Sequence, residues 1–327
     1  MELNFGKYDK NYSHITKSSL DERKEALSMY IDKYLGPYEQ RYFGAGHKRT
    51  QYEIIDTYIS YKQFILVAKM TQKGIWSQKG TKKKNQHLST IDSVILSTLL
   101  VDKYLEMVKE NCSDWILKSF EVRSASQPVE NIECIDLFLD FEKSSLENKK
   151  YAVNVSGMKV TLAFEQIDVD NQISKGQYNY FSSHLKYARH DLKAIDFASD
   201  DLVEGIIQRE CQNQSYSGLG SAHAGEVSLL EYLVIFSQLC EILVYNHDKI
   251  DRKDSRNLWM RYIKAEINGV SDFQAVRAFA KVDRSKKIRK GDNWSMLDVS
   301  AGTTDNRVQF TAKLAHILPV VPVDLDQ

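Results

Sequence analysis

Two long apolar segments constrain the fold of this chain most. Ser89-x-x-Asp92 begins "STIDSVILSTLLVDKYL", and Ser228-x-x-Glu231 begins "SLLEYLVIFSQLCEIL" 139 residues later. Serine followed by an acid three positions on is typical of a helix capping box, in which the serine oxygen accepts a backbone N–H and the acid reaches back. Both helices are too apolar for a surface position, so each needs to be surrounded by protein.

The chain around these helices repeats in the same order. The strand-like pair at 51–72 aligns with the pair at 191–212. After each helix come alternating strand-like segments, which begin at Trp115 and Ile132 in the first copy and at Trp259 and Phe273 in the second. One further strand, at 151–165 or 306–318, closes each copy. Before the helices, Tyr42-Phe43 and His47 are echoed by Tyr180-Phe181 and His184.

One buried helix followed by several strands predicts a sheet wrapped around the helix. The fold class is therefore α+β, a tandem or double hot-dog, with each half an antiparallel sheet around one long apolar helix. We expect the first hot-dog repeat at residues 37–168 and the second at 175–327. Residues 1–36 form an N-terminal helical extension, whose helix ends at Gly36-Pro37 and is expected to pack outside the core.

Composition excludes several classes of protein. Lys plus Arg and Asp plus Glu both number 44, so no net charge attracts nucleic acid. The apolar segment 229–245 carries Glu231, Gln238 and Glu241, which favours a buried helix over a membrane span. The four cysteines lack C-x-x-C spacing, and the N-terminus lacks the apolar core of a signal peptide, so we expect a cytoplasmic protein.

The two helix starts are the candidate catalytic positions. First-turn N–H groups and the positive end of the helix dipole can hold a thioester carbonyl or its oxyanion. Asp92 or Glu231 could then serve as general base or nucleophile, with a pKa raised by an apolar wall. His87 and His223 could each share a proton with the acid of its own copy. The alternative is that Ser89, Asp92, Ser228 and Glu231 only cap helices.

Two loops are candidates for substrate binding. "YSGLGSAHAG" precedes the second helix, and its Gly225 would let a ligand approach the backbone closely. Glu226 follows Gly225 and could replace Glu231 as the catalytic acid of this helix start if Glu226 is the first helical residue. "RYFGAGHKR" places Arg41, His47 and Arg49 where they could bind a phosphate, or could simply form a solvated turn. No spacing predicts a metal site, a P-loop or a Rossmann motif.

Two stretches carry a resemblance to a known family. "LGPYEQRYFGAGHKRTQYEI" and "QHLSTIDSVILSTLLVDKYL" resemble the bacterial avirulence D (AvrD) family, over most of the chain beyond the first 30 residues. More widely, the chain is similar to A-factor synthase (AfsA)-type proteins, which are tandem hot dogs. The family resemblance implies joining of a β-ketoacyl chain to a pentulose such as xylulose, to give acylated sugar lactones, the syringolides.

The resemblance implies an acyltransferase that takes a β-ketoacyl thioester of an acyl carrier protein or coenzyme A, transfers the acyl group to a sugar-like hydroxyl and needs no other cofactor. Asp92 and Glu231 would be its catalytic candidates, with Ile95, Leu99, Val234 and Phe236 walling the acyl tunnel. The same fold also serves thioesterases, dehydratases and acyl-binding modules without catalysis, and these alternatives stay open. Since one chain contains both halves, either a monomer or a homodimer is expected.

Overall fold

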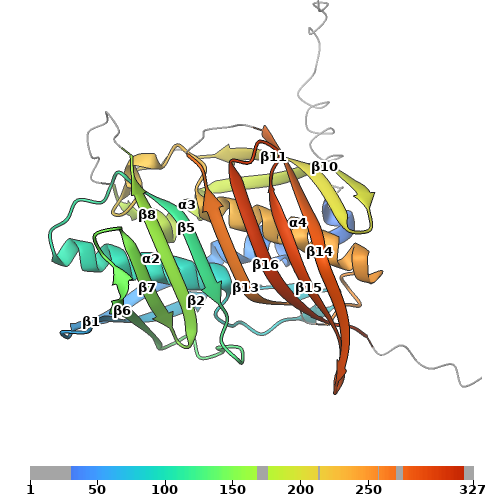
Figure 1. The fold of residues 1–327 in the computed structure, drawn as a ribbon, viewed down its shortest axis with the longest axis horizontal. Helices are drawn as coiled ribbons and strands as arrows, with labels where there is room; N and C mark the ends of the chain where they lie inside the picture. Colours follow the sequence, from blue (N-terminus) through green and yellow to red (C-terminus); the bar gives the residue numbers. More distant parts are fainter. Residues whose placement is uncertain (1–30, 168–175, 213, 257, 270–274, 320–327) are drawn as a thin grey trace, which may run out of the picture.

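The computed structural model describes residues 31–167, 176–212, 214–256, 258–269 and 275–319. One antiparallel sheet of 12 strands curves around two long helices, α2 (Thr90–Met107) and α4 (Leu229–Asp248). Figure 1 shows both helices against one face of this sheet, with the green strands over α2 and the red strands over α4. The predicted α+β tandem hot-dog fold is confirmed.

Equivalent strands have the same order in the two halves of the sheet, counted in each half from the outer edge to the centre. The first half runs β1-β2-β6-β7-β8-β5 and the second β13-β16-β15-β14-β11-β10, so β5 pairs with β13 at the centre. The first-half strands are β1 Thr50–Ile59, β2 Gln63–Gln72, β5 Trp115–Arg123, β6 Ile135–Ser145, β7 Lys150–Val155 and β8 Met158–Gln166. Those of the second half are β10 Ala188–Ser199, β11 Leu202–Cys211, β13 Leu258–Ile267, β14 Ala275–Lys290, β15 Asp292–Thr303 and β16 Val308–Ile317.

Short elements lead into each long helix. Before α2 lie η1 (Tyr38–Gln40), η2 (Tyr42–Gly46), η3 (His47–Arg49) and the small hairpin of β3 (Gln78–Lys79) and β4 (Lys82–Lys83). Before α4 lie α3 (Tyr180–Tyr187), η4 (Ser221–His223) and the parallel pair of β9 (Tyr178–Asn179) and β12 (Tyr216–Ser217). The echo between Tyr42 and Tyr180 therefore marks equivalent lead-in segments.

The long helices are buried on nearly every side. Residues 91–101 of α2 are all buried, which explains why their sequence shows no polar face. By length and composition α4 could cross a membrane, but 89% of its most apolar window is buried inside the protein, as in a core helix. A tilted ring contact ties α4 to the sheet, where the ring centroid of Phe310 of β16 lies 4.8 Å from that of Phe236.

Three details differ from the sequence prediction. Residues 151–165 form a hairpin, β7–β8, instead of one strand, because Ser156 and Gly157 both adopt positive φ in a tight turn. Strand β15 was missed, and β14 is longer than expected. The start of the predicted strand at Phe273 lies outside the described residues.

The N-terminal helix also differs from expectation in the part that is described. Residues 31–35 are helical, and the chain turns at Gly36, whose φ is +73° before Pro37. Ile31 and Leu35 are buried in the core, so packing outside the core was a wrong prediction for this part. Tyr34 meets Phe197 of β10 at 5.6 Å, which attaches the helix to the second half.

Candidate functional site

A pocket of about 490 Å³ opens at the start of α2. Its wall includes the helix start, from His87 to Thr90, and residues of the other half, from Leu258 to Arg261 at the start of β13. Met158 and Leu314 add apolar surface, and Ser124 to Glu130 line a further side. The pocket therefore lies between the two halves, at the end of the central β5–β13 pair.

Ser89 connects this pocket to a buried carboxylate. The predicted capping box is present, since Asp92 N donates to Ser89 Oγ and Ser89 N donates to Asp92 Oδ2 at 3.0 Å. Ser89 Oγ also donates to Asp92 Oδ2 at 2.5 Å. Ser89 lines the pocket, whereas the Asp92 side chain is fully buried behind it. Asp92 therefore reaches the pocket through the hydroxyl of Ser89.

Two tyrosines complete the shell around Asp92. Tyr52 of β1 donates to Asp92 Oδ1 at 2.6 Å, and Tyr42 of η2 donates to Oδ2 at 2.9 Å. Tyr42 Oη also lies 2.6 Å from Ser89 Oγ. Burial raises the pKa of the Asp92 carboxyl, and the hydrogen bonds from Ser89 and the tyrosines offset only part of that rise. The result is a carboxylate with neutral partners and increased basicity, as expected from the sequence.

His87 does not share a proton with Asp92. Its Nδ1 lies 3.3 Å from the carbonyl of Asn85, and its ring lies between Trp76 and Trp259, at 4.5 and 6.1 Å. Burial lowers the pKa of His87. The predicted His87–Asp92 pair is therefore wrong, and the histidine instead contributes a neutral aromatic surface to the pocket wall.

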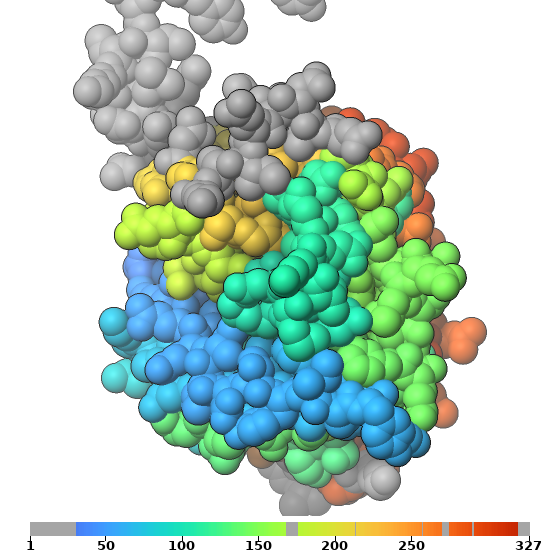
Figure 2. All heavy atoms as spheres, turned by 90° about the vertical axis from the view of Figure 1, so that its left-hand side faces the viewer, coloured from blue at the N-terminus to red at the C-terminus, as the bar shows by residue number. Residues whose placement is uncertain are grey.

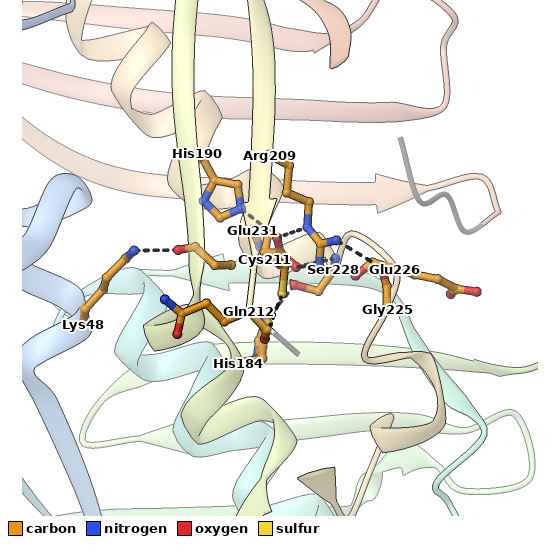
Figure 3. A network of polar contacts seen from close by, with 11 residues as sticks. Lys48, His184, His190, Arg209, Cys211, Gln212, Gly225, Glu226, Ser228 and Glu231 are labelled. Carbon is orange, nitrogen blue, oxygen red and sulfur yellow. Dashed lines mark hydrogen bonds and ion pairs between the residues drawn. The ribbon is translucent and has the colours of Figure 1, made fainter. Parts of the chain in front are cut away.

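The second helix start repeats the capping box but surrounds its acid with charges. Ser228 N donates to Glu231 Oε1, and Glu231 N donates to Ser228 Oγ at 3.1 Å. His190 Nε2 lies 2.7 Å from Glu231 Oε2, to which Arg209 Nε donates at 2.8 Å. Figure 3 shows His190 and Arg209 converging on Glu231 from two neighbouring strands.

This network joins the start of α4 to the loop that precedes it. Arg209 also donates to the carbonyls of Gly225 and Glu226, both at 3.0 Å, and so fixes the loop before α4. Burial alone would raise the pKa of Glu231, but the hydrogen bonds and charges of His190 and Arg209 hold it well below its ordinary value. The expectation of a raised pKa is therefore wrong for Glu231. The cavity at this mouth measures about 30 Å³.

The other residues predicted around the second mouth have structural partners. His223 Nδ1 lies 3.1 Å from Glu226 Oε2, and its Nε2 lies 3.0 Å from the carbonyl of Asp114, so it does not pair with Glu231. Glu226 precedes the helix, which begins at Leu229, so it is not the first helical residue. Glu226 and His223 line the small cavity, and Gly225 does not.

The three residues of the first lead-in that were predicted to bind a phosphate lie outside the large pocket. Arg41 is buried and pairs with Asp32 at 3.0 Å, and Arg49 pairs with Glu39 and donates to the carbonyl of Ile75. His47 is buried with Nδ1 3.0 Å from the carbonyl of Tyr42, and burial lowers its pKa to about 3. None of the three lines this pocket, so the phosphate site predicted for them does not form there.

Other basic side chains occupy the wall instead. Lys79, Lys83, Lys84 and Arg261 line the pocket, together with Glu130 and Glu241. Lys79 uses its Nζ for three hydrogen bonds, which it donates to Tyr245 Oη, Ser255 Oγ and the carbonyl of Arg256. The predicted tunnel residues Ile95, Leu99, Val234 and Phe236 are buried in the core and do not line this pocket.

Helix α4 contributes Ser237, Cys240 and Glu241 to the same pocket. Ser237 is buried, and its Oγ has no hydrogen-bond partner among the residues that the structure describes. Burial raises the pKa of the Cys240 thiol to about 12, so it is a poor nucleophile. Among the described residues, no three or more His, Cys, Asp or Glu side chains are grouped as metal ligands.

The sequence search missed Tyr42 and Tyr52 as partners of Asp92, and His190 and Arg209 as partners of Glu231. His190 and Arg209 are opposite each other in the β10–β11 ladder. His190 also lies on the same buried face of β10 as Ala188 and Leu192, so a polar residue at an inward position was the available signal.

Comparison with known proteins gives one family. The model of the family described as Pseudomonas avirulence D protein (AvrD) matches residues 26–161 and 177–319. No curated protein matches the chain.

Solved structures with a similar course of the chain have very different sequences. A tesB protein from Mycobacterium avium subsp. paratuberculosis is 8% identical, with a TM-score of 0.42, over 82% of this chain and 96% of that chain. A putative thioesterase II from Thermobifida fusca is 10% identical, with a TM-score of 0.40, over 82% and 96%. A dehydratase-cyclase domain of ambruticin biosynthesis is 7% identical, with a TM-score of 0.37, over 82% and 95%. Similarity at this level says nothing about the reaction.

Proposed function

Since the chain belongs to the Pseudomonas avirulence D protein (AvrD) family, we propose that it is an acyltransferase that moves a β-ketoacyl group from a thioester to a hydroxyl of a sugar-like hydroxyketone. The observation that carries this proposal is the large pocket at the start of α2, where Ser89 is backed by the buried, more basic carboxylate of Asp92. The family resemblance supplies the acyl chain and the acceptor.

The helix start supplies the electrophilic side of the reaction. The N–H groups of the first turn have no partner within the helix, and they point out of its N-terminus with the positive end of the dipole. Thr90, the first residue of α2, lines the pocket. A thioester carbonyl placed here would gain stabilisation as its oxygen becomes negative.

Asp92 supplies the basic side. A hydroxyl group that attacks the thioester has to lose its proton, and the Ser89–Asp92 hydrogen bond leads from the pocket to a carboxylate that accepts hydrogen bonds from neutral hydroxyl groups. Glu231 lacks these properties, because its charge is balanced by Arg209 and its cavity is small. We therefore assign the reaction to the mouth of α2 alone.

The donor is a thioester carried by coenzyme A or by an acyl carrier protein. Both carry the acyl group on a phosphopantetheine arm. Lys83 and Arg261 are exposed at the pocket wall, where they suit a phosphate of that arm. The apolar side chains of Met158, Leu258 and Met260 suit the acyl chain.

The direct test uses purified protein, a 3-oxooctanoyl N-acetylcysteamine thioester, and xylulose as acceptor. Mass spectrometry should detect an acylated acceptor that forms only when both substrates are present. Free acid at the same rate with and without xylulose would show hydrolysis instead. Binding without any turnover of this thioester would show an acyl-binding module.

Variants of α2 test the assignment of the base. Asp92→Asn should lower the transfer rate by about 100-fold or more, because it removes the proton acceptor. Asp102→Asn makes the same change further along α2, at a half-buried acid that lines neither cavity described here, and should retain transfer if the protein folds. Equal activity of Asp92→Asn and wild type would contradict the assignment.

A further inference from the structure

The arrangement at the mouth of α2 separates the base from the substrate. Asp92 is fully buried, and both of its carboxylate oxygens already accept hydrogen bonds from Tyr42, Tyr52 and Ser89. Ser89 is only partly buried and lines the pocket. Tyr42 also lines the pocket but is buried, so the more exposed hydroxyl that presents this network to a substrate is the Oγ of Ser89.

We propose that Ser89 is a nucleophile, which carries the acyl group as a covalent ester between thioester and acceptor. The inference rests on the proposed function and adds a two-step course to it. A general base alone would let the acceptor attack the thioester directly, with no acyl-enzyme. The two courses make different predictions about Ser89.

Hydrogen bonding orients Ser89 for this role. Its hydroxyl proton is directed at Asp92 Oδ2 at 2.5 Å, while its oxygen accepts from Asp92 N and lies 2.6 Å from Tyr42 Oη. Tyr42, whose pKa burial raises well above its ordinary value, stays protonated and donates to the same Oδ2, while Tyr52 holds Oδ1 on the other side of the carboxylate. A nucleophile next to a base that is itself held by a third group is the pattern of activated serine in acyl transfer.

The position in the helix adds an oxyanion site. Ser89 is the N-cap of α2, so the N–H groups of Thr90 and Ile91 follow it directly and lack partners within the helix. An oxyanion formed on a carbonyl attacked by Ser89 Oγ would lie beside these donors. Nucleophile, base and oxyanion donors thus all belong to one helix turn.

The chemistry balances without any further reactant. In the first step Ser89 Oγ bonds to the thioester carbonyl carbon, and its proton passes to Asp92. The carbon–sulfur bond breaks, the sulfur leaves with the proton from Asp92, and Ser89 is left as an ester. In the second step the acceptor hydroxyl attacks this ester and gives its proton to Asp92, which returns it to Ser89 Oγ as the ester bond breaks.

Other groups on the pocket wall suit the role less well. The thiol of Cys240 has a pKa raised to about 12 by burial, so little thiolate forms. His87 has no carboxylate partner among the described residues. Ser228 forms the same capping box, but its Oγ lies 2.7 Å from His184 Nε2 and the cavity beside it is small.

The experiment uses the full chain and the 3-oxooctanoyl N-acetylcysteamine thioester. Without acceptor, intact-protein mass spectrometry should show one added acyl group, and peptide mapping should place it on Ser89. With xylulose varied at several thioester concentrations, double-reciprocal plots should give parallel lines. Intersecting lines, or an acyl group mapped to another residue, would overturn the inference.

Variants separate this inference from the proposed function. Ser89→Asn keeps a good N-cap but removes the hydroxyl, and should lose the adduct and at least about 100-fold of the transfer rate. Ser97→Ala removes a hydroxyl that donates to the carbonyl of Ser93 within α2, and should keep both. Transfer by Ser89→Asn at the wild-type rate would overturn the nucleophile while leaving acyl transfer established. Absence of transfer by the wild type would instead contradict the proposed function.

Discussion

Asp92 and Glu231 occupy the same position in two copies of one structure, yet their surroundings differ. Asp92 accepts hydrogen bonds from neutral hydroxyl groups, whereas Glu231 is paired with Arg209 and His190. The first arrangement raises the pKa of the acid and the second lowers it. One capping box thus leaves a carboxylate able to take up a proton, and the other stabilises the fold.

The structural role of Glu231 predicts a large effect on stability. Glu231→Gln would leave the guanidinium of Arg209, which is 9% exposed, without its counter-charge. Removing one partner of a buried ion pair costs about 3–5 kcal/mol, so we expect the free energy of unfolding to fall by about that amount. Urea denaturation followed by circular dichroism measures it. Glu204→Gln, at a more exposed acid of β11, is the control and should change little.

The same pair predicts how stability depends on pH. The folded-state pKa of Glu231 lies below its ordinary value of 4.5, so its stabilisation is present above pH 4.5 and is lost as the pH falls below it. The difference in unfolding free energy between wild type and Glu231→Gln should therefore shrink between pH 6 and pH 3, a range of about three units around that ordinary pKa. A difference that stays constant over this range would show that Glu231 is not stabilised by its charge.

Ser237 predicts an effect of the opposite sign. Its buried hydroxyl has no partner within the described part of the chain, whereas Thr98, 139 residues earlier on α2, donates to the carbonyl of Ile95 at 2.7 Å. An unpaired buried hydroxyl is unfavourable and alanine favours helix, so Ser237→Ala should raise the free energy of unfolding by about 0.5–1 kcal/mol. Thr98→Val, which removes a satisfied hydroxyl, should lower it. Thermal denaturation without substrate compares the two, and destabilisation by Ser237→Ala would contradict this account.

At the scale of elements, a glycine in the loop before α4 is required by close packing and not by a need for flexibility. Gly218 has φ +82°, and a Cβ there would lie 2.6 Å from Asp102 Oδ2 of α2. Asp102 accepts hydrogen bonds from Leu219 N at 2.9 Å and Asn179 Nδ2 at 2.7 Å, so it ties the second lead-in to the first helix. Gly218 therefore serves a contact between the two halves.

Two alanine variants distinguish packing from flexibility. Gly218→Ala should lower the free energy of unfolding by at least about 1–2 kcal/mol, because of its left-handed backbone and the contact with Asp102. Gly225→Ala, where a Cβ would meet nothing within 4 Å, should be nearly neutral. Chemical denaturation of both proteins measures the difference. Equal stability of the two variants would refute the role assigned to Gly218.

The repeat, the helices and both capping boxes could be predicted from sequence, because these signals lie within a few residues of each other. The partners of the acids could not, since Tyr52 lies 40 residues before Asp92 and His190 41 residues before Glu231. These contacts depend on strand register and on how each lead-in crosses its helix. His87 and His223 were predicted as partners because they are close to the acids in sequence. In the structure they contact the backbone carbonyls of Asn85 and Asp114.

At the scale of the whole molecule, β1 and β10 are the two edge strands of the sheet that the described residues form. Residues of β1 and the following turn are exposed although they are apolar, namely Ile55, Tyr58, Ile59 and Tyr61. In Figure 2 the blue N-terminal residues and the teal end of α2 share this side of the molecule. Whether the chain acts as a monomer or a homodimer stays a prediction from the repeat.

The centre of the molecule predicts that both halves unfold together. β5 and β13 pair from Tyr262–Arg123 to Glu266–Ser119, and Phe120 of the first half meets Phe310 of the second at 6.2 Å. Each lead-in also contacts the helix of the other half, since η2 packs on α4 and Asp102 of α2 holds the loop before α4. Separating the halves would expose core residues and break these hydrogen bonds, so neither half should survive alone.

We therefore expect a single calorimetric transition, with equal van't Hoff and calorimetric enthalpies. Tryptophan fluorescence gives a second measurement for each half, because Trp76 and Trp115 lie in the first and Trp259 and Trp294 in the second. In the double variant Trp259→Phe/Trp294→Phe, the remaining tryptophan fluorescence reports only on the first half. Its fluorescence transition should have the same midpoint temperature as its far-ultraviolet circular dichroism transition. Two separate transitions, or a fluorescence change well before the loss of secondary structure, would show that the halves are independent and that the pocket between them can open without unfolding either one.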